Sequence, residues 1–108
     1  MQYDYKPNNW VVLKLKVQGI IQYRLLGGTS GGYLEGDSWR LNSGITSVEE
    51  DGNYLLFHGV SGSIYQCRKD SNVVRMNMAG MLASLQERYN AEVLDSSHDW
   101  LNFDWSNK

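Results

Sequence analysis

The stretch WVVLKLKVQGIIQYRLL, residues 10–26, has the alternating pattern of two β-strands that are joined by a tight turn. Gly19 stands between the two halves, at a place where a hairpin needs a residue that accepts a left-handed conformation. We therefore predict strands over residues 10–17 and 20–26. The first strand alternates two sets of side chains, which are Val11, Leu13 and Leu15, and Val12, Lys14 and Lys16.

Two registers are open for this hairpin. A two-residue loop of Gln18 and Gly19 mixes polar and apolar side chains on both faces of the hairpin. A three-residue loop that also includes Val17 pairs Leu15 with Ile21 and leaves one face apolar. Because register follows the burial of one apolar face, we predict the three-residue loop. The polar face of this register carries Lys14, Lys16 and Arg24.

Further strands follow along the chain. LLGGTSGGYL (residues 25–34) and LFHGVSGSIY (residues 56–65) are identical at four of ten positions, and each reads as a strand, a tight Gly/Ser turn and a new strand. Between them, Asp51 and Gly52 give a hairpin signal that separates residues 45–49 from residues 54–58. The pattern predicts five or six short strands in meander order.

Helical periodicity occurs in one segment, which has Asn77 as its N-cap and ends before Asn90. Five apolar residues fall there on one helical face: Met78, Met81, Leu82, Leu85 and Tyr89.

Five or six strands are too few for two sheets and favour a small barrel. The predicted fold is therefore mainly β, a five- or six-stranded antiparallel meander barrel with one C-terminal helix. We divide the chain into an N-terminal extension (residues 1–9), the barrel with its helix (residues 10–90) and an acidic, aromatic tail (residues 91–108).

The composition is that of one globular domain. The chain has 108 residues, 42% of them hydrophobic and 12% aromatic, which excludes a disordered chain. Its apolar runs are too short for a membrane span. The net charge of −2 disfavours a strongly basic nucleic-acid module. The charge is arranged in blocks, because residues 1–30 carry four basic side chains against one acidic, and residues 31–60 carry one against five.

The sequence shows few features of a catalytic or metal-binding site. The single Cys67 and the widely spaced His58 and His98 exclude an intrachain disulfide and give no metal-chelating spacing. The segment GTSGG, residues 28–32, resembles the nucleophile segment of chymotrypsin-like serine proteases, but no histidine precedes Ser30 to act as its base. We therefore predict no enzyme activity, no catalytic or metal-binding residue and no cofactor.

The C-terminal segment DWLNFDW, residues 99–105, places large aromatic side chains between acidic ones. So much aromatic surface is unusual for a frayed end, so we predict that this segment docks on the face that carries Lys14, Lys16 and Arg24, or on a neighbouring subunit. The same cationic face is a candidate for single-stranded nucleic acid, because cations follow phosphates while nearby aromatic rings stack on bases. The docking residues of the tail are Trp100, Phe103 and Trp105.

Two resemblances bear on origin and fold. GYLEGDSWRLNSGI (residues 32–45) and GNYLLFHGVSGSIYQC (residues 52–67) resemble small uncharacterised proteins of tailed phages that infect marine cyanobacteria, which implies a viral origin without an activity. The order Gly32, Leu34, Asp37, Asn42 is similar to the first half of the Sm motif of RNA-binding ring proteins. The Asp-to-Asn spacing is one residue longer than in that family, and the Arg-Gly of the second half is absent. The resemblance therefore implies an Sm-like barrel alone.

Together, the candidate exposed strands, four tryptophans and blocked charge favour a non-enzymatic binding or assembly module that self-associates. Its expected partner is a second copy or another protein. The alternative is a weak single-stranded nucleic-acid (RNA) binder with an Sm-like barrel. The segment MQYDYKPNNW lacks the pattern of a signal peptide, so we expect a cytoplasmic protein with no membrane partner, in the host cytoplasm if it is phage-encoded.

Overall fold

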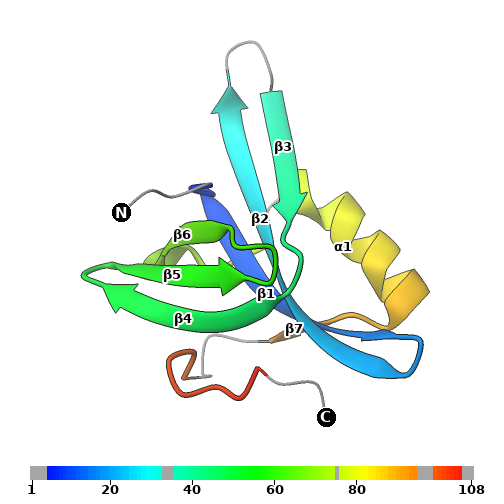
Figure 1. Cartoon of the computed structure of the whole chain (residues 1–108). Helices are drawn as coiled ribbons and strands as arrows, with labels where there is room; N and C mark the ends of the chain where they lie inside the picture. The colour runs from blue at the N-terminus through cyan, green and yellow to red at the C-terminus, as the bar shows by residue number, and fades with distance from the viewer. Residues whose placement is uncertain (1–4, 33–35, 75, 95–98, 106–108) are drawn as a thin grey trace.

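The computed structural model describes residues 5–32, 36–74, 76–94 and 99–105. The fold is mainly β, as predicted, with seven strands and one α-helix among these residues (Figure 1). The described part of the chain contains no helix that is long and apolar enough to cross a membrane. The elements are β1 (Asn9–Val17), β2 (Ile20–Gly32), β3 (Gly36–Leu41), β4 (Ile45–Asp51), β5 (Tyr54–Gly59), β6 (Ile64–Arg68), a short 3-10 helix (Lys69–Ser71), α1 (Met76–Tyr89) and β7 (Glu92–Leu94).

The strands form two antiparallel sheets, ordered β3-β2-β1-β7 and β4-β5-β6. The expectation that the chain has too few strands for two sheets is therefore wrong. A three-residue strand that the sequence pattern did not reveal, β7, lies beside β1 and completes the larger sheet. No strand pair joins the two sheets among the described residues, so closure into a barrel is not confirmed.

The hairpin of β1 and β2 has the register that we did not choose. Lys14 pairs with Tyr23, and Gln18 and Gly19 form the two-residue loop with φ of 52° and 81°. These left-handed conformations match the tight primed turn that suits the twist of a hairpin. The predicted three-residue loop is wrong because both faces of this sheet are buried, so the apolar side chains need not gather on one face.

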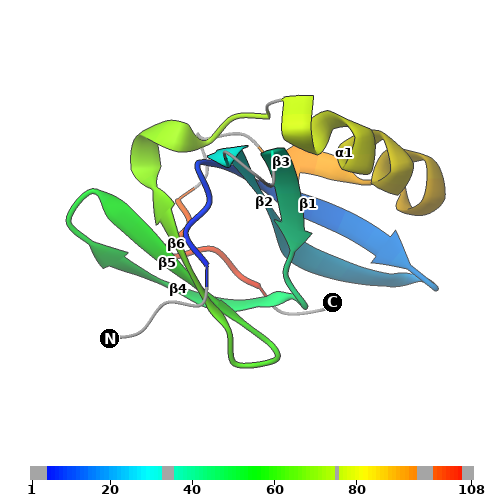
Figure 2. The ribbon, with the colours of Figure 1, turned by 90° about the horizontal axis from the view of Figure 1, so that it is seen from above.

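One face of β1 packs toward the second sheet, and the other packs toward α1. In Figure 2, α1 and the sheet of β4, β5 and β6 lie on opposite sides of β1 and β2. The core between the sheets is built from Trp10, Val12, Leu25, Ile45, Leu55, Phe57, Tyr65, Cys67 and Trp100. The core under the helix is built from Val11, Leu13, Leu15, Leu26, Met78, Leu85 and Ala91. The predicted helical face therefore covers the larger sheet.

The two copies of the glycine-rich pattern adopt different structures. The second is a strand, a turn and a strand, as predicted, because β5 ends at Gly59 and β6 begins at Ile64. In the first copy the predicted tight Gly/Ser turn is wrong, because β2 continues through these residues to Gly32 and pairs with β3. Figure 1 shows this outer part of the hairpin extending past the second sheet. We call residues 27–32 and 36–41 the β2–β3 arm.

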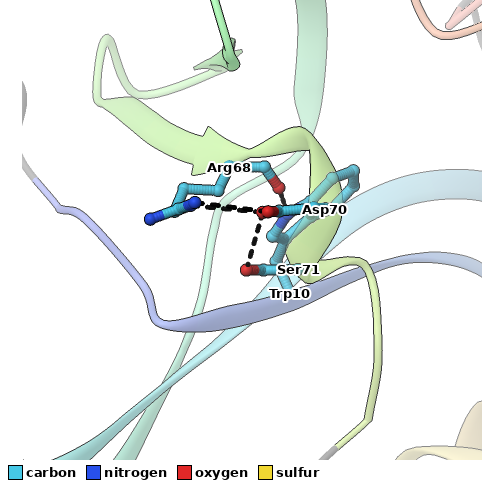
Figure 3. A network of polar contacts seen from close by, with 4 residues as sticks. All are labelled: Trp10, Arg68, Asp70 and Ser71. Atoms are coloured by element: carbon cyan, nitrogen blue, oxygen red, sulfur yellow. Dashed lines mark hydrogen bonds and ion pairs between the residues drawn. The ribbon is translucent and has the colours of Figure 1, made fainter.

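A polar contact of Trp10 connects the two sheets (Figure 3). Its indole N–H donates a hydrogen bond of 2.6 Å to the main-chain oxygen of Arg68, at the end of β6. The side chain of Arg68 lies 3.2 Å from Asp70, and this hydrogen-bonded pair lowers the pKa of the Asp70 carboxyl. Both charged side chains are more than half exposed, so the ion pair adds little to stability. The hydrogen bond from the buried Trp10 indole to Arg68 contributes more to stability.

Gly27 allows the N-terminal segment to pack against the start of the arm. A Cβ at this position would lie 2.9 Å from both the Cβ of Pro7 and the Cε2 of Tyr5. The same segment reaches the second sheet, where the main-chain N–H of Gln66 donates to the oxygen of Tyr5. Any residue with a Cβ at position 27 would therefore collide with Tyr5 or Pro7, so only glycine fits there without a shift.

We predict that Gly27→Ala lowers the free energy of unfolding by about 1–3 kcal/mol, because the added methyl group overpacks a closed contact. The matched control is Gly80→Ala in α1, where a Cβ would have no atom within 4 Å. This control raises the free energy of unfolding by about 0.5–1 kcal/mol, because alanine favours a helix over glycine. Urea denaturation measures both. A Gly27→Ala variant as stable as the parent would contradict the close packing of Tyr5 and Pro7.

Candidate binding surfaces

The structure separates the three predicted cationic residues. Lys14 lies directly opposite Tyr23, whereas Arg24 lies opposite Leu13. Because directly paired residues share a face of the sheet, Lys14 and Lys16 lie on the side of the second sheet and Arg24 lies on the side of α1. Glu92 of β7 also stands directly opposite Lys14. The predicted single cationic face is therefore not formed.

The aromatic residues of the tail pack against the core of their own chain. Trp100 is buried, and its ring centroid lies 6.3 Å from that of Trp10. Phe103 and Trp105 are partly buried and lie 5.1 and 5.7 Å from Tyr23. These aromatic rings thus cover the face on which Lys14 lies, next to Tyr23, the strand partner of Lys14.

A groove of about 670 Å³ opens where the tail meets β2. Its aromatic wall is formed by Tyr23, Phe103 and Trp105, and the Tyr23 ring stands at 82° to Phe103 and 79° to Trp105. Asp104 is the one charged residue in the described lining. The opposite side is formed by residues 43–46 and Val60. We call this feature the tail groove.

The buried side chain of Asn42 holds the rim of the tail groove. Its Oδ1 accepts hydrogen bonds from the main-chain N–H of Leu25 at 2.8 Å and of Gly44 at 3.2 Å. The N–H of Asn42 donates to the oxygen of Leu25 at 3.0 Å. These bonds end the pairing of β3 with β2 and turn the chain toward β4. An Asn-Ser-Gly sequence after a strand is a turn signal, but it does not reveal which backbone groups the asparagine binds.

A second set of contacts fixes the far side of the rim. The hydroxyl of Ser43 donates to the Ser61 hydroxyl at 3.0 Å and accepts from the Ser61 main-chain N–H at 3.0 Å. The N–H of Val60 donates to the oxygen of Gly44 at 2.8 Å. Gly44 has φ of 132°, and a Cβ there would lie 3.0 Å from the Val60 side chain. These contacts fix the far side of the rim, while Val60 stays 67% exposed.

The β2–β3 arm presents a different kind of surface. Strand β3 is at the edge of its sheet, and Trp39 on this strand is 48% exposed opposite Gly28. On the other face, the guanidinium of Arg40 lies 4.8 Å from the centre of the Tyr5 ring. Burial raises the pKa of the Tyr5 hydroxyl, and a hydrogen bond with Thr29 and the charge of Arg40 oppose the shift. The arm thus offers a strand edge with which no other described strand pairs, beside an exposed tryptophan.

The structure shows the surroundings of two titratable side chains that the sequence singled out, Cys67 and His58. Burial raises the pKa of the Cys67 thiol well above its usual value, which keeps the thiol protonated and unreactive. The Nε2 of His58 lies 2.8 Å from the Glu49 carboxylate on the outer face of the second sheet. In the part of the chain that the structure describes, no three His, Cys, Asp or Glu side chains gather as metal ligands.

We predict that Asn42→Ala lowers the free energy of unfolding by about 2–4 kcal/mol, because two buried main-chain N–H groups lose their acceptor. The neighbouring exposed Ser43→Ala is the control and costs less than about 1 kcal/mol. Denaturant unfolding, followed by tryptophan fluorescence, measures the difference. Equal stabilities of the two variants would contradict the role of Asn42 as the anchor of the rim.

No family model, curated protein or solved structure matches this chain. The phage resemblance and the Sm-like barrel therefore stay predictions. The function has to be argued from the two surfaces described above, the β2–β3 arm and the tail groove.

Proposed function

We propose that this chain is a non-enzymatic assembly module that associates with copies of itself through the β2–β3 arm. The observation that carries the proposal is the open edge of β3 together with the exposed ring of Trp39. An unprotected strand edge presents main-chain N–H and C=O groups that pair readily with a second strand. The partner that always offers a matching edge is another copy of the chain.

Antiparallel pairing of β3 with β3 of a second copy satisfies both edges at once. A two-fold axis between the strands makes the interface self-complementary, and it joins two sheets of order β3-β2-β1-β7 into one. The arm itself favours this arrangement, because beyond Gly28, where the pairing of β2 with β1 ends, it is a two-stranded ribbon, and such a ribbon is only marginally stable by itself. Pairing adds a third and a fourth strand to it.

The side chains of the arm also suit a protein interface. Tryptophan and arginine are the residues most enriched among those that dominate binding energy, and Trp39 and Arg40 follow each other on β3. Gly28 opposite Trp39 has no side chain, so the indole ring is not covered from β2. The Trp39 ring is therefore available to a partner across the edge.

The alternative function, a weak single-stranded nucleic-acid binder with an Sm-like barrel, has less support. Its cationic residues lie on two faces, since Arg24 is on the side of α1 and Lys14 is on the other. Glu92 stands opposite Lys14, and Asp104 lines the nearby tail groove. Phosphate binding needs several cations on one continuous surface, which this arrangement does not supply.

The test is the oligomeric state in solution. We predict a dimer for the parent chain by sedimentation equilibrium, and a dissociation constant that Trp39→Ser weakens by about 30-fold, as for loss of an interface hot spot. The matched control is Ile20→Ser, which removes an apolar side chain of similar exposure, 51%, from the other end of β2. It leaves the dissociation constant unchanged.

Three results would overturn the proposal. One is a parent chain that stays monomeric at high concentration, and the other is a dimer that Trp39→Ser and Ile20→Ser affect equally. A dimer that dissociates sharply between low and moderate salt also contradicts it, because main-chain pairing and indole burial depend little on salt.

A further inference from the structure

We propose that a pocket between α1 and the larger sheet, which we call the helix pocket, binds a small carboxylate that carries an apolar body. The inference goes beyond the proposed self-association through the β2–β3 arm and does not depend on it. It rests on the position of the pocket, on the apolar side chains that line it and on the two guanidinium groups among them.

The helix pocket has a volume of about 260 Å³ and lies where the C-terminal part of α1 packs on β1, β2 and β3. Figure 2 shows α1 lying across this face of the larger sheet. Phe103 and Trp105 of the tail lie against Tyr23, which is on the opposite face of the sheet. The helix pocket is therefore separate from the tail groove.

Most of the lining of the helix pocket is apolar. The apolar residues are Leu15, Val17, Leu41, Met81, Leu85 and Tyr89. Leu15 and Leu85 are buried, whereas the other four are half-buried and keep part of their apolar surface open. A ligand with an apolar body removes this surface from water, which is favourable.

The charge of the lining comes from two arginines. Arg24 lies on the α1 side of the sheet, opposite Leu13, and Arg88 lies in the last turn of α1. No aspartate or glutamate is part of the described lining, and neither arginine forms an ion pair with another described residue. The Nε–H of Arg24 donates at 3.2 Å to the side-chain oxygen of Gln22, which is uncharged. The end of α1 adds only about half a negative charge, so the two guanidinium groups favour an anion.

A carboxylate on an apolar body fits both features of the lining. A guanidinium group meets a carboxylate through two parallel hydrogen bonds, which are stronger than bonds between neutral groups. A free inorganic anion would leave the apolar side chains without a contact. The pocket is smaller than the roughly 300–1,000 Å³ of sites for drug-sized ligands, so the apolar body has the size of one ring with a short chain.

The experiment uses the Trp39→Ser variant of the full chain, with isotope-labelled methionine methyl groups, and titrates it with 3-phenylpropionate. The readout is the NMR signal of the Met81 methyl group, which Met81→Leu assigns, because the aromatic ring of the probe shifts the signal when it enters the pocket. We expect a saturable shift. We also expect binding to be weaker by about fivefold or more for 3-phenylpropanamide, which lacks the charge, and for acetate, which lacks the apolar body.

Three variants test the role of the guanidinium groups. Arg88→Gln, at an exposed position of α1, and Arg24→Gln are each expected to weaken binding of 3-phenylpropionate by about fivefold or more. Lys16→Gln removes the same charge from the opposite face of the hairpin and leaves the affinity unchanged.

An unmoved Met81 signal, equal binding of the amide or of acetate, or full affinity in Arg88→Gln each overturns the proposal. Every measurement is made without the Trp39 ring, so none of these results bears on self-association.

Discussion

The buried indole of Trp10 determines how the parts of this molecule are arranged. Its ring packs between the sheets with the centroid of Phe57 at 5.1 Å and that of Trp100 at 6.3 Å, while its N–H donates to the oxygen of Arg68. A buried indole N–H without an acceptor is costly, so the end of β6 has to lie against β1. One residue of the central strand thus orients the second sheet and provides the surface on which the tail docks. The tail groove exists because the tail docks there.

The larger sheet shows what its sequence could and could not predict. Alternation predicted strands in residues 10–26, and the Asp51-Gly52 pair predicted the hairpin of β4 and β5. The register of β1 and β2 depends on whether one face or two are covered, and this information lies in distant segments, namely α1 and the second sheet. The alternation of residues within one hairpin cannot show whether one or both faces of its sheet are buried. The wrong register then placed Arg24 on one face with Lys14 and Lys16, so the error in the candidate site follows from the error in the fold.

The two surfaces differ in how visible they were in the sequence. The aromatic residues of the tail stood out by size and spacing, but their contact with Tyr23 depends on the register that was missed. The arm was hidden because a run of glycine and serine normally marks a turn. Here Gly27 lies within a strand. The position needs a glycine because Tyr5 and Pro7 occupy the space that a side chain would fill. Such a reason for glycine involves residues twenty positions away, and it becomes visible only in three dimensions.

Both surfaces arise because β2 is longer than the strands beside it. Strand β3 pairs with β2 from Leu26 onward, so among the described residues the first part of β2 has no paired strand on the side of the tail groove, while β3 presents its own edge along the arm. Asn42 marks the boundary, because its side chain and main chain take up the polar groups of Leu25 and direct the chain away. The arm and the tail groove share no side chain, so the proposed assembly through the arm would leave the tail groove open.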